Sequence, residues 1–102
     1  MITQHLQVPA QAIESFCRKW KVRELSLFGS VLREDFGPQS DVDVLVSFGP
    51  GGAMTFEGYL EMQEELSAIF GGRHVDLVEK RLVRNPFRRH NILTNREVVY
   101  AG

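Results

Sequence analysis

Two short segments carry the residues that are able to do chemistry. Gly29-Ser30 is followed, after ten intervening residues, by Asp41-Val42-Asp43. Side chains in a strand alternate between its two faces, so Asp41 and Asp43 point the same way, roughly 7 Å apart along the backbone. Val42 and the valines that follow at every second position then point to the opposite face, into a core. One face of this strand is therefore acidic and the other is apolar.

Paired carboxylates of this kind need a cation. Two carboxylates held side by side repel each other, so the pKa of one of them rises unless a cation lies between them. Hard oxygen ligands on a rigid strand suit Mg²⁺, which takes one or two carboxylates and fills its other positions with water and substrate phosphate. Gly29 lets the backbone approach a ligand closely. Ser30 is placed to cap a following helix near residues 30–34, whose first amides favour a phosphate. A phosphate cradle beside a metal site is what phosphoryl or nucleotidyl transfer requires.

The spacing of these residues resembles the signature of the nucleotidyltransferase superfamily that includes DNA polymerase β. The Leu27-Phe28 lead-in, Arg33 and the short chain resemble its smallest branch, the minimal nucleotidyltransferases. Members of that branch are often paired with a HEPN-domain protein as toxin and antitoxin. The resemblance extends from about Glu24 to Glu79. It implies an α/β (α+β) nucleotidyltransferase fold.

The resemblance also implies roles for individual residues. Three carboxylates would be catalytic and hold the metal: Asp41, Asp43 and Asp76. Four residues would bind the nucleotide: Gly29, Ser30, Arg33 and Ser40. Asp76 is included because its strand is similar to the one that carries the third aspartate in this superfamily. Two Mg²⁺ ions would be held, largely recruited together with ATP. AMP would pass from ATP to a hydroxyl, expected to be a tyrosine of a HEPN-type toxin partner, and this chain would act as the antitoxin.

Simpler explanations of the same residues remain open. An Asp-x-Asp strand is often a solvated sheet edge, and Gly-Ser is often only a turn. Asp76 and Arg33 can also be interpreted as ordinary charged side chains that face solvent. His74 is interpreted as a partly exposed structural histidine. Two other functions also stay open. One is a non-catalytic binding module that neutralises its partner by occlusion. The other is a small-molecule, aminoglycoside-type nucleotidyltransferase. The lack of room for an acceptor domain argues against this alternative.

Composition sets the outer limits. The 102 residues suffice for one domain with one modest core, so residues 1–102 are interpreted as a single domain. A net charge of −1 gives no reason to expect nucleic acid, and no apolar run suggests a membrane partner. Cys17 is the only cysteine, which excludes an internal disulfide and favours a cytoplasmic setting. Homo- or hetero-oligomerisation is left open.

Periodicity predicts the elements that must position these residues. Strands are expected near 24–28, 41–48 and 73–79, in a small mixed sheet packed against helices near 9–20, 55–70 and 86–93. The return of the chain from Ser30 to Asp41 implies that the first two strands are antiparallel. Residues 98–100 are expected to form an edge strand or a docking tail.

Side-chain patterns add detail to three of these segments. In the first helix, one apolar stripe is formed by Ile13, Phe16, Cys17 and Trp20. In the longest helix, apolar residues recur near helical spacing: Phe56, Tyr59, Leu60, Leu66, Ile69 and Phe70. A basic cluster near the C-terminus is either a solvated face or a contact surface for an acidic partner: Lys80, Arg81, Arg84, Arg88 and Arg89. The glycine-rich turn at 49–52 is expected to shift when nucleotide binds.

Overall fold

The computed structural model describes residues 6–34, 36–37 and 39–102. Its elements follow one another as α1 (Ala10–Trp20), β1 (Val22–Phe28), the 3₁₀ helix η1 (Gly29–Leu32), β2 (Val42–Phe48), α2 (Phe56–Ile69), β3 (Val75–Glu79), the 3₁₀ helix η2 (Lys80–Leu82), α3 (Pro86–Thr94) and β4 (Arg96–Ala101). The predicted α/β class and the three predicted helices and strands are confirmed. The strand predicted from residue 24 begins at Val22, and the strand predicted from residue 73 begins at Val75.

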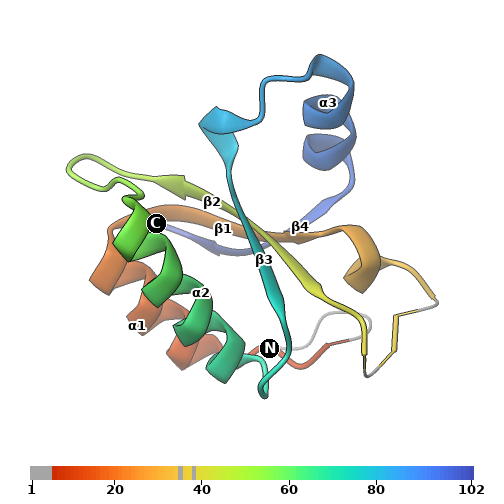
Figure 1. Cartoon of the computed structure of the whole chain (residues 1–102), viewed down its shortest axis with the longest axis horizontal. Helices are drawn as coiled ribbons and strands as arrows, with labels where there is room; N and C mark the ends of the chain where they lie inside the picture. The colour runs from red at the N-terminus through yellow and green to blue at the C-terminus, as the bar shows by residue number, and fades with distance from the viewer. Residues whose placement is uncertain (1–5, 35, 38) are drawn as a thin grey trace.

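A four-stranded mixed sheet in the order β3-β2-β1-β4 is the centre of the molecule. β1 is antiparallel to both β2 and β4, and β2 is parallel to β3 (Figure 1). The predicted antiparallel pairing of the first two strands is confirmed, and residues 98–100 lie in the edge strand β4. The parallel pair is joined by α2, as a parallel connection requires.

One face of the sheet is covered by α1 and α2, which lie side by side in Figure 1. Val42, Val44 and Val46 of β2 are fully buried there, as their alternation with polar residues predicts. The predicted stripe of α1 is buried at Ile13, Phe16 and Cys17, whereas Trp20 is only partly buried. Burial also raises the pKa of the Cys17 thiol to about 12, so this cysteine packs as a small apolar side chain.

The face predicted for α2 is wrong in part. Phe56 is 79% exposed and Leu60 is 49% exposed, whereas Met62 and Leu66 are fully buried. Only one narrow stripe of a helix reaches a flat sheet, and the i, i+4 pair of Met62 and Leu66 defines it here. Phe56 and Leu60 fall outside that stripe although they recur near helical spacing.

The opposite face of the sheet carries α3, which lies above the strands in Figure 1. Asn85 caps this helix: its side-chain oxygen accepts hydrogen bonds from the amides of Phe87 and Arg88 at 3.0 and 3.1 Å, and Pro86 is the first helical residue. A second apolar cluster on this face holds the helix against the sheet: Phe28, Leu45, Val83 and Ile92.

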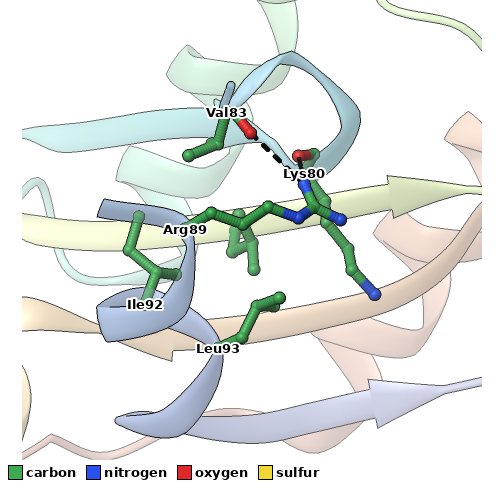
Figure 2. A pocket seen from close by; sticks show the side chains of 6 residues that line it. Lys80, Val83, Arg89, Ile92 and Leu93 are labelled. Carbon is green, nitrogen blue, oxygen red and sulfur yellow. Dashed lines mark hydrogen bonds between the residues drawn. The ribbon is translucent and has the colours of Figure 1, made fainter. Parts of the chain in front are cut away.

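Arg89 is one of the residues that tie α3 to the segment before it. Its guanidinium donates to the carbonyls of Lys80, at 2.7 Å, and Val83, at 3.3 Å (Figure 2). The hollow between these groups, Ile92 and Leu93 has essentially no space for a water molecule. Arg89 is therefore a structural residue, whereas Arg84 and Arg88 of the predicted basic cluster are exposed.

The glycine-rich turn at 49–52 lies at the end of β2 remote from Asp41, roughly 20 Å of strand away. It packs on Lys21, whose carbonyl accepts a hydrogen bond from the Gly49 amide at 2.9 Å. A nucleotide bound near Asp41 would not reach this turn, so the structure gives no support to a shift there. In the described part of the chain, no helix is both long and apolar enough to cross a membrane.

Candidate active site

The acidic side chains converge because β2 and β3 are parallel and in register. Asp43 and Asp76 are direct partners in the β2–β3 ladder, so both side chains point to the same face of the sheet. It is the face that carries α3, since the neighbouring pair of Val42 and Val75 is buried under α1 and α2. Asp41 directly precedes β2 and lies two residues before Asp43. The three predicted carboxylates are thus placed at one end of one face.

The Gly-Ser turn adjoins this acidic face. Phe28, the last residue of β1, is the ladder partner of Asp43, and the chain turns at Gly29 with φ +71°. A Cβ added at Gly29 would lie 2.3 Å from the Oδ2 atom of Asp43, so only glycine leaves room for this carboxylate. The Ser30 amide donates to the same Oδ2 atom at 3.4 Å, and the Ser30 hydroxyl donates to the Asp41 carbonyl at 2.9 Å.

The expectation that Ser30 caps a helix is wrong. The helix is η1, four residues of 3₁₀ geometry whose cap is Phe28, with no side-chain hydrogen bond at that position. The Ser30 hydroxyl is used instead to hold the start of the Asp41–Asp43 segment. A phosphate at this turn would have to take over the hydrogens that Ser30 now gives to Asp41 and Asp43.

The environment of Asp43 disfavours its negative charge. Burial is the largest cause and raises the pKa of this carboxyl above its ordinary value; the charges of Asp76 and Asp41 raise it further. The Ser30 amide and the guanidinium of Arg33 act in the opposite direction. The sequence-based expectation that one carboxylate of the group titrates high is confirmed, although burial contributes more than repulsion does.

The donor set fits a hard divalent cation, since it consists of carboxylate oxygens on one face, and burial and the neighbouring carboxylates disfavour the charge of Asp43. The ligands are not closed around a centre. Asp41 Oδ1 lies 3.4 Å from His74 Nδ1, and nowhere in residues 6–34, 36–37 and 39–102 do three acidic, histidine or cysteine side chains group closely enough to hold a metal. Closing these ligands around one ion would therefore require the carboxylates to move closer together.

Arg73 organises the loop that delivers Asp41, and the sequence provided no signal for it. Its guanidinium donates to the carbonyls of Gly37 and Ser40 at 2.9 and 3.1 Å and lies 4.6 Å from the centre of the Phe36 ring. Ser40 closes the same loop: its hydroxyl accepts from the Gly37 amide at 3.0 Å. The nucleotide-binding role of Ser40 stays a prediction.

A cleft of about 570 Å³ opens beside Gly29, between η1 and α3. Arg33 lines it from the η1 side, which places this residue next to the acidic group as the prediction requires. Three polar residues line it from α3: Arg88, Asn91 and Asn95. Their part in the site was not predicted, because about fifty residues separate them from the motif in the sequence.

A mixed sheet with this acidic edge beside a Gly-Ser turn defines the chain as a nucleotidyltransferase. Residues 10–99 match the family model described as the nucleotidyltransferase domain, and the chain belongs to this family. Two archaeal relatives are similar to it. The protein adenylyltransferase MntA of Thermococcus cleftensis is 37% identical over 83 residues, 81% of this chain and 78% of the relative. MJ1379 of Methanocaldococcus jannaschii, provisionally named a protein adenylyltransferase, is 38% identical over 74 residues, 72% of this chain and 73% of the relative.

Solved structures share the fold. The crystal structure of a toxin-antitoxin with AMP-PNP superposes with a TM-score of 0.73 at 20% identity, covering 93% of this chain and 75% of the other. The family match and the named relatives confirm the family and the nucleotidyltransferase class predicted from the sequence.

Proposed function

We propose that this single-domain chain transfers AMP from ATP to a tyrosine hydroxyl of a HEPN-domain toxin and thereby acts as its antitoxin. The observation that carries the proposal is the in-register pair of Asp43 and Asp76 beside Gly29, where an acidic group and a turn with no side chain meet. The names of the relatives support protein as the acceptor, and the toxin-antitoxin crystal structure with a nucleotide analogue supports both toxin and ATP.

Asp41, Asp43 and Asp76 would hold Mg²⁺, as two ions recruited largely with ATP; bound Mg²⁺ neutralises phosphate charge and lowers the pKa of the attacking hydroxyl. The Gly29 amide, the Ser30 hydroxyl and the Arg33 guanidinium would orient the triphosphate. Positioning and charge stabilisation are the main contributions of the protein to such a transfer.

At the α-phosphorus of ATP one bond forms and one breaks. The tyrosine oxygen bonds to the α-phosphorus of ATP, the bond from that phosphorus to the oxygen bridging to the β-phosphorus breaks, and pyrophosphate leaves. The hydroxyl proton passes to Asp76, which is exposed and can release it to solvent. The AMP-capped tyrosine has no phenolic hydrogen, so it can neither donate that proton nor form a phenolate, and the toxin would be silenced.

The test is to incubate the chain with ATP, Mg²⁺ and the HEPN-type protein encoded beside it, and to weigh the partner intact. We expect an added mass of one AMP or a multiple, which disappears with Asp43→Asn and remains with Gly37→Ala, a change at a glycine with open space around it. An unchanged partner mass would refute protein adenylylation. If Asp43→Asn still neutralised the toxin, occlusion would be the function, and ATP turnover with small hydroxyl compounds alone would indicate the small-molecule type.

A further inference from the structure

The cleft between η1 and α3 has two chemically different walls. The wall on the η1 side carries the Gly29 turn and Arg33 beside the acidic group, where a triphosphate would bind. The wall on the α3 side carries Arg88, Asn91 and Asn95, and Phe28 and Ile92 add apolar lining. The volume of about 570 Å³ lies within the range of small-molecule sites. The cleft thus offers a lining for anionic groups at Gly29 and Arg33, and a lining for a neutral, flat group at the two asparagines.

Asn91 and Asn95 leave one donor and one acceptor unused. The Asn95 side-chain nitrogen donates to Asn91 Oδ1 at 2.8 Å, and also to the Asn91 carbonyl and the Thr94 hydroxyl. These bonds occupy the Asn91 side-chain oxygen and the Asn95 amide hydrogens. Within the described residues, the Asn91 Nδ2 donor and the Asn95 Oδ1 acceptor have no hydrogen-bond partner, and both side chains are exposed to the cleft. A linked donor-acceptor pair therefore faces the open space.

This pair suits a base rather than a phosphate. The unused Asn95 oxygen would repel an anion, and the pair lies at the C-terminal end of α3, where the helix dipole is negative. Adenine presents a complementary edge, with a 6-amino donor next to the N7 acceptor, whereas guanine presents two acceptors at O6 and N7. An asparagine amide pairs with the adenine edge through two hydrogen bonds.

We propose that Asn91 and Asn95 read the adenine base of the bound nucleotide and set a preference for ATP over GTP. Arg89 fixes the position of α3, because its guanidinium donates to the carbonyls of Lys80 and Val83 in the preceding segment (Figure 2). Arg88, whose guanidinium has no partner among the residues the structure describes, lies one turn before Asn91 and adds charge without reading the base.

The inference rests on the proposed function, because it assumes that ATP is the nucleotide, so its test measures binding without any acceptor. Binding of ATP, GTP and ITP is measured by calorimetry with Mg²⁺ for the wild type and for the double variant Asn91→Ala/Asn95→Ala. We expect the wild type to prefer ATP about tenfold or more, and the double variant to lose most of that preference. His90→Ala, an exposed change on the same helix outside the cleft, is the matched control and keeps the preference.

Arg88→Ala separates charge from base reading: it weakens all three nucleotides by a similar factor and leaves their ratio unchanged. Thermal melts of each variant establish that it is folded. If the wild type binds ATP, GTP and ITP equally, or if the double variant keeps the preference, the inference is overturned while the proposed transferase stands. If the wild type binds no nucleotide with Mg²⁺, the proposed function itself is refuted.

Discussion

Gly29→Ala tests the physical basis of the site most directly. The added Cβ would meet Asp43 Oδ2 at 2.3 Å and Asp43 Cγ at 3.1 Å, and the backbone at this position has φ +71°. The carboxylate would have to retreat by roughly 0.7 Å to reach 3.0 Å, the closest approach that real Cβ atoms make. Because a misplacement of about 1 Å costs on the order of 100-fold in rate, we expect nucleotidyl transfer to fall roughly 30- to 100-fold.

The same change has a separate and smaller effect on stability. Alanine at a left-handed position costs about 1–2 kcal/mol, and each kcal/mol lowers the melting temperature of a chain of this size by about 4–8 °C. Asp43 is a short, movable side chain, so the contact itself adds little to the free energy lost. The variant should therefore remain folded at the temperature of a transfer assay.

Gly71→Ala is the matched control. Gly71 has φ +75°, nearly the same backbone strain, but a Cβ there meets nothing within 4 Å. We expect it to melt lower by a similar amount and to keep its transfer activity, measured as AMP added to the partner by intact mass. The reasoning would be refuted if Gly29→Ala and Gly71→Ala differed less than about threefold in rate.

Three further predictions concern the surroundings of the site. In EDTA at pH 7, Asp43→Asn should melt at a higher temperature than the wild type. The folded-state pKa of Asp43 is raised, so the wild type loses stability as the pH rises from the ordinary pKa of 3.8 through the folded-state pKa. The gain should vanish in melts below pH 3.8, and equal gains at both pH values would contradict the cause given. Arg73→Ala should lower transfer severalfold by releasing the loop before Asp41, with a loss of about 1–3 kcal/mol in urea unfolding; unchanged transfer would exclude the positioning role. Arg89→Ala should cost about 1.5–3 kcal/mol in the same assay, whereas the exposed Arg84→Ala should stay within about 0.5 kcal/mol, and equal values would show that Arg89 does not anchor α3.

Several features of the site were predictable because they depend on neighbours in the chain. The alternation of Asp41, Val42 and Asp43 assigns carboxylates and valines to opposite faces of any strand that forms there. Asn85-Pro86 is a local start signal, and it is satisfied by amides only two and three residues away. Even here local patterns failed once: Ser30 has the residue type of a helix cap, but its hydroxyl bonds to the Asp41 carbonyl instead.

The amino-acid sequence by itself determined which residues are acidic, which face each occupies and which family the chain belongs to. Only the tertiary structure decided that Asp43 and Asp76 stand in register, that burial is the main cause of the raised Asp43 pKa, and that Arg73 and α3 complete the surroundings of the site. The reason is physical. Strand register and helix placement depend on contacts between residues far apart in the chain, and a periodic pattern in one segment does not specify its partner in another.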